Sequence, residues 1–217
     1  MHPLDYLINK DEALRYLGWQ KELPEENAAL YDKAEELFLA AAQPKYYYQV
    51  FDKNELGFLL AGNDIAAHLA NSEKIVLLAA TLGSAVDMLI RRSQIEDMAL
   101  SVIIDALASA AIEEVCDAAA ESVHKEYPHL RQTSRYSPGY GDWDLSMQKE
   151  FLRTLNAEKK IGLCLNSSLL LTPLKSVTAA IGLENKDAPR IIKKKDCTAC
   201  NLFASCAYRK GGTTCGH

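Results

Sequence analysis

The sequence predicts an α+β fold in which a mixed or antiparallel sheet packs against one long central helix. Helical and strand-like segments alternate without the regular strand–helix–strand period of a parallel α/β protein. The stretch 95–127 contains neither Gly nor Pro, and apolar side chains recur in it at helical spacing. We therefore expect a helical N-terminal arm over residues 1–43, a central domain over residues 44–190 and a cysteine-rich tail over residues 191–217.

Composition excludes several classes of protein. The 217 residues carry 24 Lys and Arg against 29 Asp and Glu, a net charge of −5, and 48% of them are hydrophobic. The acidic balance argues against sequence-independent nucleic-acid binding, which needs a basic face. The start of the sequence lacks the basic and apolar stretches of a secretory signal, and no apolar run approaches the ~20 residues that span a bilayer. We expect a cytoplasmic protein that binds neither nucleic acid nor membrane.

The first half of the chain predicts helices followed by a sheet. Residues 11–41 read as two helices that are separated by Gly18 and Pro24. Aromatic and β-branched residues make 46–51 a strand, with 57–61 as its hairpin mate. A short helix from Asn63 to Leu69 and a buried strand over 74–80 follow.

The second half begins with the long helix, predicted from Ile95 to Tyr127 and ended by Pro128. One apolar stripe runs along its first part, formed by Ile95, Ala99, Ile103, Ala106 and Ala110. Beyond the helix we expect a loop over 131–143, a helix over 145–155 and strands over 161–165 and 176–183.

Two acidic residues fall where the stripe of the long helix would continue. Steps of three and four from Ala110 lead to Glu113 and then to Asp117. A buried carboxylate is costly unless a cation or a hydrogen-bond donor meets it. Either the stripe ends there and Glu113 is solvated, or Glu113 faces a pocket and holds an ammonium group.

The segment 135–143 is rich in residues that recognise ligands. Arg135 offers a planar fork for a carboxylate, Pro138 and Gly139 shape the backbone, and Tyr140 and Trp143 offer flat faces for stacking. A simple Pro-Gly turn with an exposed arginine has the same composition.

The order of these motifs resembles a known family. The pattern Arg135-x-x-x-Gly139-Tyr140 follows the helix that carries Glu113 and precedes the run Leu171-Thr172-Pro173-Leu174-Lys175-Ser176-Val177. This arrangement resembles the reactivation domain of cobalamin-dependent methionine synthase, and most closely the stand-alone versions of that domain. The resemblance covers about residues 44–185.

The resemblance implies a reactivation factor that binds S-adenosylmethionine and presents it to a corrinoid protein. It implies that Arg135 contacts the ligand carboxylate, Glu113 the ligand amine and the backbone of Pro138 and Gly139 the adenosine. It places Tyr140 near both ligand and corrin, as the catalytic-site residue. The implied partners are a cobalamin-binding methionine synthase or another corrinoid protein, and an electron donor such as flavodoxin or ferredoxin.

The tail lies outside this resemblance and suggests a metal. Its cysteines follow the pattern Cys197-x2-Cys200-x5-Cys206-x8-Cys215, and four close thiolates suit either zinc or an iron–sulfur cluster. Free cysteines on a flexible end remain the alternative. A second function follows from the tail alone, namely an electron-transfer or metal-binding accessory protein for a corrinoid enzyme, without S-adenosylmethionine binding.

Overall fold

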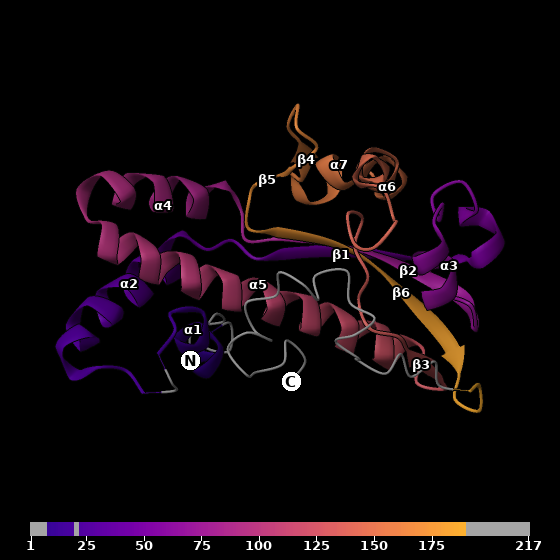
Figure 1. The fold of residues 1–217 in the computed structure, drawn as a ribbon, viewed down its shortest axis with the longest axis horizontal. Coiled ribbons are helices and arrows are strands. Elements are labelled where there is room, and N and C mark those ends of the chain that lie inside the picture. Colours follow the sequence, from indigo (N-terminus) through magenta and orange to yellow (C-terminus); the bar gives the residue numbers. More distant parts are fainter. Residues whose placement is uncertain (1–7, 20–21, 190–217) are drawn as a thin grey trace, which may run out of the picture.

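A computed structural model describes residues 8–19 and 22–189 of the chain and shows an α+β fold (Figure 1). The helices are α1 (Lys10–Tyr16), α2 (Ala28–Ala41), α3 (Asn63–His68), α4 (Ser84–Glu96), α5 (Met98–Glu126), α6 (Gln148–Leu155) and α7 (Ala157–Ile161). The strands are β1 (Lys45–Asp52), β2 (Ser72–Thr81), β3 (Leu130–Gln132), β4 (Cys164–Leu165), β5 (Leu171–Thr172) and β6 (Ser176–Asn185).

The main sheet has the strand order β1-β2-β6-β3, and each neighbouring pair is antiparallel. The 29-residue α5 runs along one face of this sheet, and α1, α2 and α4 pack on α5. The other face carries α6, α7 and the small antiparallel sheet β4-β5. The predicted fold class is therefore confirmed in the described residues, with a sheet that is wholly antiparallel.

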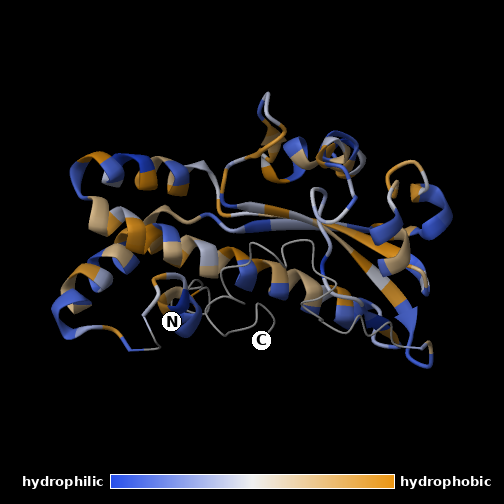
Figure 2. Ribbon diagram, viewed as in Figure 1, coloured by the Kyte–Doolittle hydropathy of each residue, from blue (hydrophilic) through white to orange (hydrophobic). Residues whose placement is uncertain are grey.

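Two hydrophobic cores form because β2 is buried on both faces. Alternate side chains of a strand point to opposite faces, so a strand covered on both sides reads as a continuous apolar run. To the first core, on the α5 side, β2 contributes Val76, Leu78 and Ala80. To the second core, on the other side, it contributes Ile75, Leu77 and Ala79. Figure 2 shows hydrophobic residues along the central strands of the sheet and hydrophilic residues at the end of β6.

The predicted hairpin mate of β1 is wrong. The chain after β1 forms a short 3-10 helix, Lys53–Leu56, instead of a returning strand, and β1 pairs with β2. A capping box stabilises this turn, with Asp52 accepting from the backbone and Glu55 accepting from the Asp52 N–H. Leu56 and Leu59 both lie in the second core. Their separation of three residues is typical of a helix and not of a strand.

The long helix predicted over 95–127 is confirmed as α5, but it begins at Met98 and not at Ile95. The break between α4 and α5 lies at Asp97, which leaves the helical conformation and accepts a hydrogen bond from the Leu100 N–H at 3.1 Å as the N-cap of α5. Ile95 belongs to the end of α4 and is 88% exposed, whereas Ile103, Ala106 and Ala110 of the predicted stripe are buried. The predicted stop holds, since α5 ends at Glu126, before Pro128.

Two smaller boundaries also differ. The segment predicted as a strand over 161–165 is the end of α7 followed by the two-residue β4, because Gly162 adopts a left-handed conformation that closes the helix. The predicted loop 131–143 begins with β3, which pairs with the end of β6. No helix in the described residues is long and apolar enough to cross a membrane.

Candidate functional site

An arginine from the chain after β3 meets two carboxylates of α5. The Arg135 Nη2 lies 2.6 Å from Glu113 Oε2, and its Nη1 lies 2.5 Å from Asp117 Oδ1. Residues four apart on a helix share a face, so one guanidinium can reach both acids. The Glu113 carboxylate therefore meets a cation of the chain itself, and its side chain remains 43% exposed.

Pairing with β6 positions Arg135. The next residue, Tyr136, forms an isolated antiparallel bridge with Ala180, in which each backbone N–H donates to the other residue's carbonyl oxygen. This bridge extends the sheet edge by one residue and directs the preceding side chain toward α5. The Arg135 side chain is 27% exposed, so it is shielded but open to a ligand.

The turn that follows Arg135 is closed by its own backbone. The Tyr140 N–H donates to the Ser137 carbonyl, and the Gly139 N–H donates to the Trp143 carbonyl at 2.7 Å. Gly139 has φ +94°, a conformation that glycine adopts without strain. Pro138 is buried in this turn and Tyr140, at its far end, is 59% exposed.

These residues border a cavity of about 370 Å³. It is lined by Glu113, Arg135, Ser137, Tyr140, Gln148, Leu171, Ser176, Val177 and Thr178. The cavity thus brings together the predicted Glu113, Arg135 and Tyr140, while Pro138 and Gly139 lie within the turn that joins two of its lining residues. The volume lies in the range of small-molecule sites.

Two polar residues of this wall were not foreseen from the sequence. Thr178 and Gln148 are buried, and the Thr178 hydroxyl donates to Gln148 Oε1 at 2.8 Å. Thr178 lies on β6 and Gln148 starts α6, so only the packing of that helix on the sheet joins them. Nothing in the local sequence of either residue signals this contact.

Electrostatics keep Arg135 charged and the neighbouring thiol inert. Burial lowers the pKa of the Arg135 guanidinium. The hydrogen bond to Asp117 and the nearby acids together raise this pKa by more than burial lowers it, so the net shift is upward. Burial raises the pKa of Cys116, on the same helix, to about 12. Cys116 is a buried, free cysteine, so it serves packing and not thiolate chemistry.

Trp143 is not the ligand-stacking surface that the sequence suggested. The indole is buried, and its Nε1–H donates to the Leu59 carbonyl at 2.9 Å. Its ring packs between Tyr136 and Phe151 in the second core. A buried Trp needs a partner for its N–H, and the turn after Leu56 provides one.

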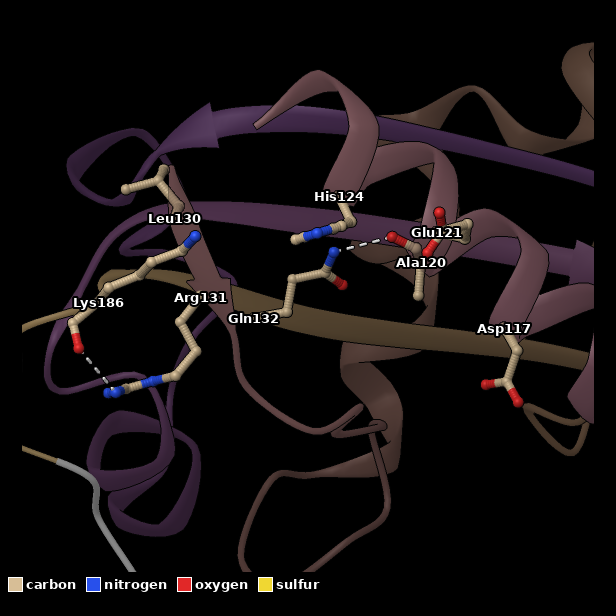
Figure 3. A pocket seen from close by; sticks show the side chains of 8 residues that line it. All are labelled: Asp117, Ala120, Glu121, His124, Leu130, Arg131, Gln132 and Lys186. Atoms are coloured by element: carbon tan, nitrogen blue, oxygen red, sulfur yellow. Dashed lines mark hydrogen bonds between the residues drawn. The ribbon is translucent and has the colours of Figure 1, made fainter. Parts of the chain in front are cut away.

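A second cavity, of about 590 Å³, lies further along α5 (Figure 3). Asp117, Glu121 and His124 line it from the helix, while Arg131 and Lys186 lie across from them. The Gln132 side chain joins its two sides by donating to the Ala120 carbonyl at 2.8 Å. Asp117 therefore lines this second cavity and also holds the arginine of the first.

The predicted metal ligands Cys197, Cys200, Cys206 and Cys215 lie outside the described residues. Within residues 8–19 and 22–189, no group of three or more His, Cys, Asp or Glu side chains is placed to hold a metal ion.

In sequence, the chain matches no protein-family model and no curated protein. In fold, it is similar to a solved structure described as the crystal structure of the MetH reactivation domain bound to AdoHcy. The TM-score is 0.62 at 15% sequence identity, over 86% of this chain and 77% of that chain. At this identity the likeness is one of fold.

Proposed function

We propose that this chain binds S-adenosylmethionine in the 370 Å³ cavity and presents its methyl group to a corrinoid protein, as a reactivation factor of the methionine synthase type. The observation that carries the proposal is the pairing of Arg135 with Glu113 at the wall of that cavity. A fold similar to the MetH reactivation domain, whose structure was solved with AdoHcy, supports it.

The charges of the cavity complement the amino-acid end of this ligand. That end carries one carboxylate and one ammonium group, so it needs one cation and one anion side by side. The planar fork of Arg135 can donate hydrogen bonds to the carboxylate, and Glu113 can accept hydrogen bonds from the ammonium. Gln148 and Thr178 add polar groups deeper in the wall for the remainder of the ligand.

The role of this chain in methyl transfer is positioning. The chemistry that a partner's corrinoid supplies is a cobalt nucleophile for the sulfonium methyl group. Arg135 and Glu113 would fix one end of the ligand and so hold the sulfonium in one orientation. Tyr140 is exposed and lines the cavity, and in this proposal it would contact both the ligand and a docked partner.

Calorimetric titration of S-adenosylmethionine into the 217-residue chain, purified without oxygen, tests the proposal. We expect saturable binding that Arg135→Ala weakens by roughly ten- to hundred-fold, because a hydrogen bond to a charged group is worth about 1.5–3 kcal/mol. Arg153→Ala, which removes an exposed arginine from α6, is the matched control and should bind as the parent does.

Two results would overturn the proposal. One is no binding to the parent chain, even with a cobalamin-loaded partner present, which would leave the tail cysteines as the remaining candidate chemistry. The other is equal binding by Arg135→Ala and the parent, with circular dichroism showing that both are folded.

A further inference from the structure

Both terminal nitrogens of Arg135 are already occupied by carboxylates of the chain itself. Glu113 Oε2 lies 2.6 Å from Nη2, and Asp117 Oδ1 lies 2.5 Å from Nη1. The two acids differ in where they lie, because Glu113 lines the proposed ligand cavity with Arg135, whereas Asp117 lines the neighbouring one. Asp117 thus reaches the guanidinium from outside the ligand cavity.

A ligand carboxylate would need the same kind of contact that Asp117 makes. The strongest arginine–carboxylate geometry uses two parallel N–H groups of the fork, and a fork shared with other carboxylates has fewer of these to offer. The contact with Asp117 is the easier one to break, because water can solvate the freed carboxylate. The Asp117 side chain is 64% exposed, against 43% for Glu113. Glu113 is also the acid that can hold the ligand's ammonium from within the cavity.

We propose that Asp117 is a built-in competitor for the ligand's carboxylate. It holds the Arg135 guanidinium when the cavity is empty, and the carboxylate of S-adenosylmethionine takes its place on binding. Asp117 then turns back to solvent and to the second cavity, while Glu113 stays with the ligand. This inference rests on the proposed function, and it makes Asp117 a residue that limits affinity without contacting the ligand.

The test compares two ligands that differ only in the contested group. S-adenosylmethionine and decarboxylated S-adenosylmethionine share the adenosine, the sulfonium and the amine, but the second has no carboxylate. Three proteins are titrated with each ligand by calorimetry: the 217-residue parent, Asp117→Ala and the matched control Glu121→Ala, which lies one helical turn further along the second cavity. We expect Asp117→Ala to tighten binding of S-adenosylmethionine by about two- to five-fold, the range for an exposed ion pair.

The other measurements separate competition from a general charge effect. Binding of the decarboxylated ligand should not tighten in Asp117→Ala, and Glu121→Ala should leave the affinity for S-adenosylmethionine unchanged. Equal or weaker binding of S-adenosylmethionine by Asp117→Ala would show that Asp117 positions Arg135 rather than competes, and would overturn the inference. Tightening by Glu121→Ala, or of both ligands, would overturn it as well. If the parent does not bind S-adenosylmethionine at all, the proposed function itself fails, a result distinct from binding that Asp117→Ala leaves unchanged.

Discussion

Asp142 anchors the turn that carries Tyr140 to the start of α3. Its carboxylate accepts the backbone N–H groups of Asn63 and Asp64, at 2.7 and 2.9 Å, and its own N–H donates to the Asp64 side chain at 3.3 Å. The preceding residue, Gly141, leaves no room for a side chain, because an added Cβ would lie 2.5 Å from the Tyr136 hydroxyl. The position of the turn that carries Tyr140 thus depends on the contacts of Asp142 with the start of α3.

These contacts make the contribution of Asp142 to the stability of the fold depend on pH. The backbone N–H groups of Asp64 and Asn63 lower the pKa of the Asp142 carboxyl. A carboxyl with a lower pKa in the folded than in the unfolded state stabilises the fold above its unfolded pKa, near 4, and that stabilisation is lost as the pH falls through the folded pKa.

Asp142→Asn should therefore destabilise the protein at pH 7 and have a smaller effect at pH 3. Urea unfolding followed by circular dichroism at both pH values gives the two differences from the parent. Asp32→Asn, which changes an exposed carboxylate on α2, is the control. The same loss of stability at pH 7 and pH 3 would contradict this assignment.

The break between α4 and α5 shows how one capping residue redirects an otherwise continuous helical pattern. Asp97 can cap α5 because its side chain reaches the free Leu100 N–H, which a helix running through this point would have used internally. The consequence is that the apolar residues on either side of it have different surroundings, with Ile95 at the exposed end of α4 and Ile103 packed in the first core.

This pair of isoleucines gives a prediction with an internal control. Ile103→Ala should lower the free energy of unfolding by about 2–5 kcal/mol, the range for removing a buried aliphatic side chain. Ile95→Ala should change it by less than about 0.5 kcal/mol, because Ile95 is exposed. Urea unfolding of both variants measures the difference, and similar losses would show that residues 95–103 pack as one helix face.

The candidate cavity exists only in the assembled molecule. Its walls come from α5, the turn after Arg135, the start of α6, β5 and β6, which are distant in sequence. Since β6 pairs with β2 and α5 packs on the same sheet, a ligand held by these walls is bound by the folded state as a whole.

Ligand binding should accordingly stabilise the entire described fold. S-adenosylmethionine at a hundred times its dissociation constant adds about 2.7 kcal/mol to the free energy of unfolding. For a chain of this size that corresponds to a rise in Tm of roughly 5–10 °C. Scanning calorimetry with and without the ligand measures the shift, and Arg135→Ala at the same ligand concentration should show much less. A parent Tm that the ligand leaves unchanged would contradict binding in this cavity.

Local patterns in the sequence were enough to predict the elements whose signals are strong. The aromatic run in β1, the continuous apolar run in β2 and the proline after α5 each act within a few residues, and all three predictions are confirmed. Helical spacing also led from Ala110 to Glu113 and Asp117, the two acids that meet Arg135. Such features depend on covalent geometry and on short-range sterics, which the sequence carries directly.

Only the tertiary structure decided what depends on distant partners. Residues 57–61 do not pair with β1 as predicted, because β2, a longer apolar strand, pairs with β1 instead. Trp143 became part of the second core because the turn before α3 offers its N–H a carbonyl. Asp117 became a partner of Arg135, and Gln148 a partner of Thr178, because packing brought their elements together. The sequence alone determined most of the helical and buried segments and the segment rich in ligand-binding side chains, whereas long-range packing and hydrogen bonding determined which of those side chains share a cavity.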